Sequence, residues 1–79
     1  MTIEVRLFAN LARYLPGGGR GATAALEVPE GTTVQQVVRR LAIPEDLPRL
    51  LLVNGRDAAP EHPLDPGDIV SILPPLVGG

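Results

Sequence analysis

The group best placed for chemistry in this sequence is the carboxyl group of the terminal pair Gly78-Gly79. Residues 74–79 carry no charged side chain, and Pro74 and Pro75 favour an extended chain at the root of this segment. Six residues span about 20 Å, at about 3.3 Å each. Because glycine has no Cβ, such a tail is slender enough to enter another protein's active site. The reactive group it would carry there is the main-chain carboxylate of Gly79.

Other side chains offer little catalytic chemistry. The sequence contains no cysteine, which excludes disulfides, thiolate metal sites and a cysteine nucleophile. The single histidine, His62, lies in a proline-rich segment, where a solvated or turn-stabilising role is favoured over catalysis. Asp65 and Asp68 flank a Pro-Gly pair, and we expect them to accept hydrogen bonds within a turn. We therefore expect no metal site and no enzymatic activity of the chain by itself.

Composition limits the classes of partner. Of 79 residues, 44% are hydrophobic and 20% charged, which is typical of one small globular domain. A net charge of −2 and only two aromatic residues argue against nucleic-acid binding. The sequence has neither a basic, apolar leader nor an apolar run of membrane-spanning length, so we expect a cytoplasmic protein without a membrane partner.

The elements that would position the tail can be predicted from periodicity. Residues 2–7 alternate polar and apolar, which indicates a half-buried strand, and residues 9–15 show a short helical pattern. The glycine-rich run 17–21 predicts a flexible surface loop. Residues 23–28 form a second strand candidate. Thr33 with Gln36 forms a capping box ahead of an apolar stripe, predicting a helix that Pro44 ends. The stripe consists of Val34, Val37, Val38 and Leu41.

The remaining strands follow the helix. Residues 50–53 read as a buried strand, Asn54-Gly55 as a tight hairpin turn, residues 56–58 as a short return strand and residues 69–73 as the last strand. Leu64 is expected to fill the edge of the core. The second face of the first strand becomes apolar at Phe8, and the last strand has apolar residues on both faces. Both strands should therefore be central, and they should be parallel neighbours. The order predicts an α+β domain over residues 1–73 with the ubiquitin-like β-grasp fold: a mixed sheet of four to five strands with one main helix packed on one face.

Four segments together resemble the MoaD/ThiS family of ubiquitin-like sulfur carriers. They are Leu7-Phe8-Ala9 with Arg13, Val53-Asn54-Gly55, the run from His62 to Asp68, and the ending Pro74-Pro75-Leu76-Val77-Gly78-Gly79. The Leu7-Phe8-Ala9 segment and the segment from Pro74 to Gly79 are more similar to the small subunit of molybdopterin synthase than to the thiamine carrier. The resemblance extends over nearly the whole chain.

The resemblance implies a specific chemistry. An E1-like adenylyltransferase of the MoeB/ThiF type would adenylate the Gly79 carboxylate with ATP, and sulfur would displace AMP to leave a thiocarboxylate. Gly78 would keep the neck narrow. The acceptor enzyme would be the large, MoaE-type subunit of molybdopterin synthase. No cofactor would be bound by the carrier itself. Phe8, Pro75 and Leu76 are the candidate hydrophobic contacts with partners, although core membership is an equal alternative for Phe8.

Two departures from the family pattern leave alternatives open. The tail has Leu76-Val77 where the molybdopterin subunit typically has valine or isoleucine followed by alanine, serine or threonine. The 17–21 loop is also unusually rich in glycine. A carrier for thiamine thiazole, tungsten cofactor, cysteine or siderophore assembly is therefore also consistent with the residues. A different class is a ubiquitin-like module that binds partners noncovalently or modifies proteins. Such a module would not need a free carboxylate at Gly79.

Overall fold

The computed structural model describes residues 1–15 and 23–75. Seven elements follow in chain order: β1 (Thr2–Leu7), the 3-10 helix η1 (Ala9–Tyr14), β2 (Thr23–Glu27), α1 (Val34–Arg40), β3 (Leu50–Val53), β4 (Arg56–Asp57) and β5 (Ile69–Leu73). The expected glycine-rich loop at 17–21 and the tail residues 76–79 lie outside the described residues. Among those described, no helix is long and apolar enough to cross a membrane.

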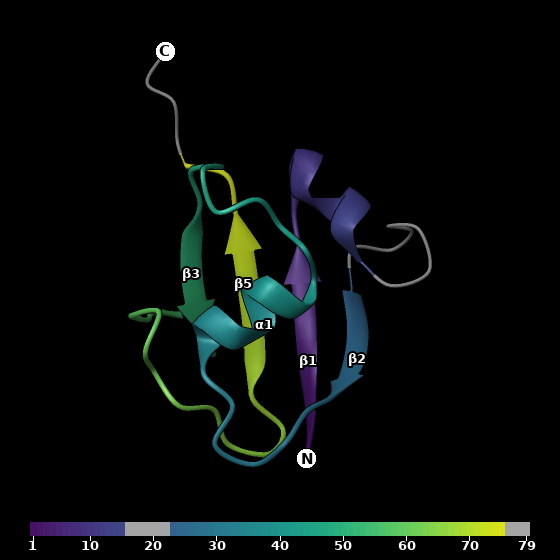
Figure 1. Cartoon of the computed structure of the whole chain (residues 1–79), viewed down its shortest axis with the longest axis vertical. Helices are drawn as coiled ribbons and strands as arrows, with labels where there is room; N and C mark the ends of the chain where they lie inside the picture. Colours follow the sequence, from purple (N-terminus) through teal and green to yellow (C-terminus); the bar gives the residue numbers. More distant parts are fainter. Residues whose placement is uncertain (16–22, 76–79) are drawn as a thin grey trace.

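The five strands form one mixed sheet in the order β2-β1-β5-β3-β4, with α1 packed across one face (Figure 1). β1 and β5 are parallel neighbours at the centre, and the other three pairings are antiparallel. The β-grasp fold and the central parallel pair are therefore confirmed. Because parallel strands end at the same edge of a sheet, β1 and β5 both finish at the end of the molecule from which the chain continues to Pro74.

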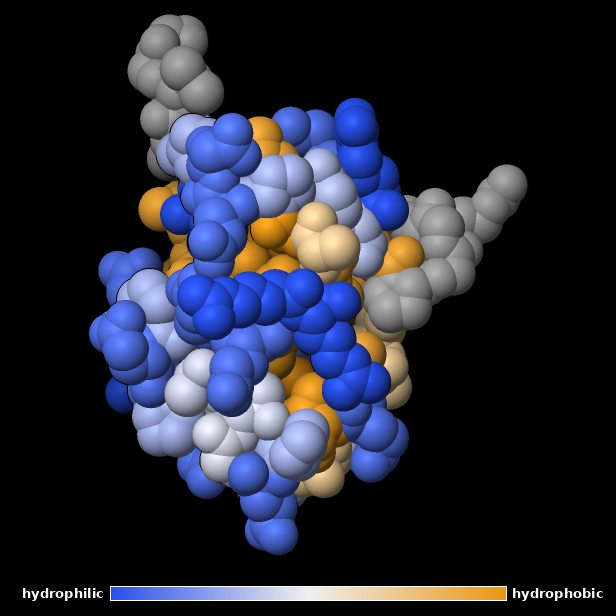
Figure 2. Space-filling model, viewed as in Figure 1, coloured by the Kyte–Doolittle hydropathy of each residue, from blue (hydrophilic) through white to orange (hydrophobic). Residues whose placement is uncertain are grey.

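The core lies between the sheet and α1. Val5 and Leu7 of β1 and Val70 and Ile72 of β5 are completely buried, as are the first three apolar positions of the helix. Leu64 is also buried, as expected, because its loop is held against the helix. The backbone N–H groups of Val34 and Gln35 donate to carbonyl oxygens of that loop, at 3.1 and 2.8 Å. The outer side of α1 is hydrophilic, and polar side chains run across the middle of this face (Figure 2).

The start of α1 matches the predicted capping box. The Thr33 side chain accepts from the Gln36 backbone N–H at 3.3 Å, while the Gln36 side-chain oxygen accepts from the Thr33 N–H at 2.9 Å. Two N–H groups that the helix itself cannot satisfy therefore have partners.

The end of α1 differs from the expectation. The helix stops at Arg40, not at Pro44, because Ala42 adopts a left-handed backbone with φ of 61°. The Ala42 and Ile43 N–H groups donate to the Arg39 and Val38 carbonyls at 3.0 and 3.3 Å. This is the Schellman arrangement, in which glycine usually occupies the left-handed position. Alanine does not indicate such a helix end in a sequence, so the pattern points to Pro44 as the end of the helix instead.

Smaller differences concern the neighbouring elements. The helical pattern at 9–15 forms a 3-10 helix, and the second strand ends at Glu27 instead of residue 28. The predicted hairpin is confirmed, since Asn54 and Gly55 both have positive φ, at 52° and 82°. Its return strand spans Arg56–Asp57, one residue shorter than expected.

Replacing Thr33 by alanine removes the acceptor for the Gln36 N–H, and we expect a loss of about 1 kcal/mol in the free energy of unfolding. Urea unfolding followed by circular dichroism measures this change. Thr33→Ser keeps the hydroxyl and is the matched control, which should remain near the native value. Equal losses for both variants would show that the cap oxygen is not the stabilising group.

Replacing Ala42 by glycine removes the cost of a Cβ in the left-handed region, which is about 1–2 kcal/mol for an L-residue. Part of that gain is offset by the greater freedom of glycine in the unfolded chain. We expect a net gain of about 0.5–1 kcal/mol by these two effects, measured by urea unfolding. Ala59→Gly, at an exposed position without positive φ, should give no gain. A loss of stability for Ala42→Gly would contradict this account of the helix end.

Candidate functional site

The root of the tail is fixed by the centre of the sheet. β5 is hydrogen-bonded to β1 on one side and β3 on the other, up to the pair Leu50↔Leu73. Pro74 and Pro75 follow and are half-buried. Because proline has no N–H group, neither can donate a further ladder hydrogen bond. Leu76, Gly78 and Gly79 lie outside the described residues, so their roles remain predictions.

Phe8 lies beside this root and is exposed, with 38% of its surface accessible. The choice between core and surface is thereby resolved in favour of the surface. Its backbone is held on both sides: the Phe8 N–H donates to the Ile72 carbonyl at 3.2 Å, and its carbonyl accepts from the Leu11 N–H at 3.0 Å. Ala9, with φ of 53°, then turns the chain into η1. The aromatic ring is therefore presented from a fixed backbone.

Three leucines share the open face of the sheet with Phe8. In the β3–β5 register, Leu51 pairs with Ile72 and Val53 with Val70, and these four face the helix or pack against its core. Side chains alternate along a strand, so Leu50, Leu52 and Leu73 point to the opposite face. Leu50 is 42% exposed, and the other two are half-buried. We call Phe8, Leu50, Leu52 and Leu73 the apolar patch.

The patch lies at the end of β5 from which the tail departs. An exposed group of large apolar residues next to a projecting chain end is typical of a protein-binding surface. The sequence pattern indicates Phe8 as a partner contact but gives no such indication for the three leucines. The run of four apolar residues at 50–53 predicts a strand buried on both faces. β3 lies between β5 and β4, but α1 covers only one face of the sheet, so alternate residues remain partly exposed.

The polar residues singled out in the sequence have structural roles elsewhere. Asp68 accepts from the Asn54 side-chain amide at 3.0 Å and from the Asp65 N–H at 2.8 Å. The Asn54 side-chain oxygen accepts from the Ile69 N–H at 2.9 Å, so these groups join the hairpin to the turn before β5. His62 is exposed. Within the described ranges, no three histidine or acidic side chains are grouped to hold a metal ion.

Surface hollows of about 320 and 460 Å³ lie elsewhere on the described part of the chain. The first lies between residues 28–32 and the helix side chains Gln36 and Arg40, and the second lies beside the β3–β4 hairpin. Neither is lined by Phe8 or by the tail root. The candidate site is the apolar patch together with the tail root, because the exposed side chains lie where the chain leaves the sheet.

Comparison with known proteins gives the site its context. The model of the ThiS family matches residues 5–79, which is nearly the whole chain including Gly78 and Gly79. The chain belongs to the ThiS family. It is thus a ubiquitin-like sulfur carrier of the ThiS/MoaD type, and the small carrier proteins of this family are not themselves enzymes. No curated protein matches the sequence.

Solved structures share the fold of this ThiS-family carrier. A Pyrococcus furiosus protein assigned as molybdopterin converting factor subunit 1 is 26% identical, with a TM-score of 0.75 and coverage of 96% of this chain and 99% of that one. SAMP1 from Haloferax volcanii is 24% identical, with a TM-score of 0.76 and full coverage of both chains. A Helicobacter pylori chain, from a complex of subunits 1 and 2 of molybdopterin-converting factor, is 22% identical, with a TM-score of 0.65 and full coverage of both chains.

The exposure of Phe8 predicts a stability contrast with its neighbour. Leu7 is completely buried, so Leu7→Ala should lower the free energy of unfolding by about 2–5 kcal/mol. Phe8→Ala should change it by less than about 1 kcal/mol, because the ring has little core packing to lose. Chemical denaturation of both variants provides the comparison. If Phe8→Ala proved as destabilising as Leu7→Ala, Phe8 would be a core residue and the patch would lose its aromatic member.

Proposed function

We propose that Gly79 of this carrier takes up sulfur as a C-terminal thiocarboxylate. An E1-like adenylyltransferase of the MoeB/ThiF type joins the Gly79 carboxylate to the AMP part of ATP and releases pyrophosphate. Sulfur at the oxidation level of sulfide then attacks the carbonyl carbon, and AMP leaves. The carrier holds no resident cofactor; ATP is consumed at the partner's site. Gly78 keeps the segment before the reacting carbon narrow.

The observation that carries the proposal is the position of the tail root. The family match runs through Gly79, and the central strand β5 delivers the chain to Pro74 beside the exposed Phe8. A partner that docks on the apolar patch would then have the tail close to its own surface. Phe8, Pro75 and Leu76 remain our proposed hydrophobic contacts, and the three patch leucines extend the group.

We further propose that the sulfur serves molybdopterin formation, with a MoaE-type large subunit of molybdopterin synthase as acceptor. The resemblance of the two chain ends to the small synthase subunit supports this assignment. So does the likeness to the Pyrococcus furiosus subunit, which is 26% identical over almost its full length. The Helicobacter pylori relative, which shares the fold, occurs in a complex of two converting-factor subunits.

A ThiS-type role in thiamine thiazole formation is the second candidate, favoured by the family model itself. The two roles differ only in the acceptor enzyme. Thiocarboxylated carrier incubated with a MoaE-type subunit and cyclic pyranopterin monophosphate should yield molybdopterin. Sulfur transfer only to a thiazole synthase would select the thiamine role instead. A noncovalent interaction module would donate sulfur to neither.

Adding one alanine after Gly79 should abolish adenylation while leaving fold and docking intact. The extra residue displaces the carboxylate from the reacting position and places a substituent next to it. Gly78→Ala should slow the reaction at least tenfold, which corresponds to only about 1.4 kcal/mol in the transition state. The assay is ATP–pyrophosphate exchange with the E1-like enzyme, alongside partner affinity from calorimetry.

Arg56→Ala, at the hairpin distant from the tail root, is the control and should exchange pyrophosphate at the native rate. Native-rate exchange by the extended chain would show that the Gly79 carboxylate is not the reacting group. If the extended chain lost both pyrophosphate exchange and calorimetric binding to the partner, the added residue would be shown to disturb docking.

A further inference from the structure

The connection between α1 and β3 leads directly to the root of the tail. Residues 42–49, which we call the brace loop, end one residue before Leu50, whose partner across the sheet is Leu73. Leu73 is the last residue of β5, and Pro74 follows it. In Figure 1 the loop passes along the same end of the sheet from which the chain leaves β5. What fixes this loop therefore also fixes the last strand pair before the tail.

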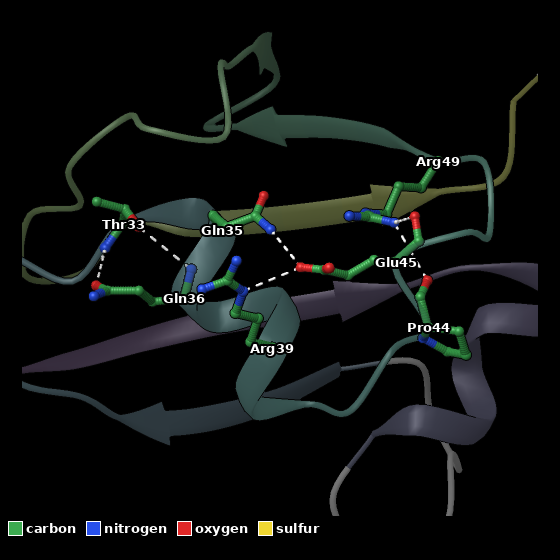
Figure 3. Close-up of polar contacts among 7 residues, drawn as sticks. All are labelled: Thr33, Gln35, Gln36, Arg39, Pro44, Glu45 and Arg49. Atoms are coloured by element: carbon green, nitrogen blue, oxygen red, sulfur yellow. Dashed lines mark hydrogen bonds and ion pairs between the residues drawn. The ribbon is translucent and has the colours of Figure 1, made fainter.

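Few backbone hydrogen bonds hold the brace loop. Pro44 and Pro48 have no N–H groups, and within residues 44–49 one backbone bond is formed, from the Leu47 N–H to the Pro44 carbonyl at 3.1 Å. The loop carbonyls are instead satisfied by Arg49. Its Nη1 lies 3.4 and 3.2 Å from the carbonyl oxygens of Pro44 and Glu45 (Figure 3). The same Nη1 lies 3.0 Å from the Leu47 carbonyl oxygen. One guanidinium group thus closes the loop at the residue that precedes β3.

The far end of the loop is fastened to α1. The Glu45 carboxylate accepts from the Gln35 side-chain amide at 2.9 Å and from the Arg39 Nε at 3.1 Å (Figure 3). The Arg39–Glu45 pair is exposed, with 66% and 58% of the two side chains accessible, so solvent screens it strongly. Arg49 is more buried, and its contacts are charge-assisted, so its contribution to loop order should be the larger one.

The environment of the Arg49 Nε is unfavourable for stability. It is buried and has no hydrogen-bond partner among the described residues. An unpaired buried donor costs free energy, and an apolar side chain at this position would avoid that cost. An arginine at position 49 is therefore explained by the three carbonyls it orders, not by packing.

We propose that Arg49 is a positioning residue for the tail: it orders the brace loop, holds Leu50 against Leu73 and so sets the direction in which residues 74–79 leave the sheet. This inference rests on the proposed function. Pro74 follows Leu73 directly, so a shift of the Leu50–Leu73 pair changes the point and the angle at which the chain leaves the sheet. Misplacement of a reacting group by about 1 Å can cost about a hundredfold in rate.

The test compares Arg49→Met, which keeps the apolar stem but removes every donor, with Arg39→Met as the matched control. Arg39 belongs to the same network but contacts neither β3 nor a loop carbonyl in the described bonds. Amide hydrogen exchange in residues 50–53 and 69–73 should accelerate about tenfold in Arg49→Met and stay native in Arg39→Met.

The same variants are assayed by ATP–pyrophosphate exchange with the E1-like adenylyltransferase. Because Leu50 and Leu73 belong to the apolar patch, KM for the carrier should rise in Arg49→Met, and kcat should fall about tenfold because the tail root is misplaced. Both constants should stay native in Arg39→Met. Arg49→Lys keeps a donor and should give an intermediate kcat, and it also provides a folded variant if Arg49→Met unfolds. Thermal midpoints confirm that all variants are folded at the assay temperature.

The inference would be overturned by native hydrogen exchange in Arg49→Met, by equal effects in Arg39→Met, or by a native kcat despite altered hydrogen exchange at the tail root. An Arg49→Lys variant no better than Arg49→Met would also contradict it. A native chain that supports no pyrophosphate exchange at all would instead refute the proposed function. The hydrogen-exchange comparison would then still decide whether Arg49 orders the tail root.

Discussion

The parallel pairing of β1 with β5 is the constraint on which the rest of this structure depends. Its inward side chains, Val5 and Leu7 against Val70 and Ile72, are completely buried, so the pair cannot separate without opening the core. Because the two strands run in the same direction, their carboxyl ends meet at one edge of the sheet. Phe8 follows the first strand and Pro74 follows the second. A buried interaction near the middle of the molecule thereby brings an exposed aromatic ring and the root of a chain end together.

As a consequence, the two faces of the sheet differ in what they contact. One face is covered by α1, whose outer side is hydrophilic (Figure 2). The other face leaves Phe8 and Leu50 exposed, at the end where the chain continues toward Gly79. In this carrier of the ThiS family, the residues that stabilise the fold are thus separate from those that we propose contact a partner. The hydrogen bonds of Arg49 connect the helix side of the molecule to the tail side. They hold the brace loop, which follows α1, against the start of β3 next to the tail root.

Local sequence signals predicted most of the fold. The capping box at Thr33, the Asn54-Gly55 hairpin and the central position of the first and last strands each rest on a short-range rule, and each is confirmed. The left-handed alanines at 9 and 42 could not be predicted, because alanine rarely adopts that conformation and tertiary packing selects it here. The exposure of the patch leucines could not be predicted either, because it depends on strand register. The Arg49 contacts could not be predicted because they lie in a loop without regular structure. The chemistry of Gly79 remains a prediction from the sequence and the family.

The central claim is that sulfur is carried on the Gly79 carboxylate. Its most direct test is the intact mass of the full chain after incubation with the E1-like adenylyltransferase, ATP and a sulfide source, followed by fragmentation of the C-terminal peptide. The account predicts a mass increase equal to the exchange of one oxygen for sulfur, confined to Gly79. Since the sequence contains no cysteine, no thiol can contribute a persulfide to that signal. An unchanged mass with an E1-like enzyme that is active on another carrier, or sulfur located on any residue before Gly79, would contradict the account.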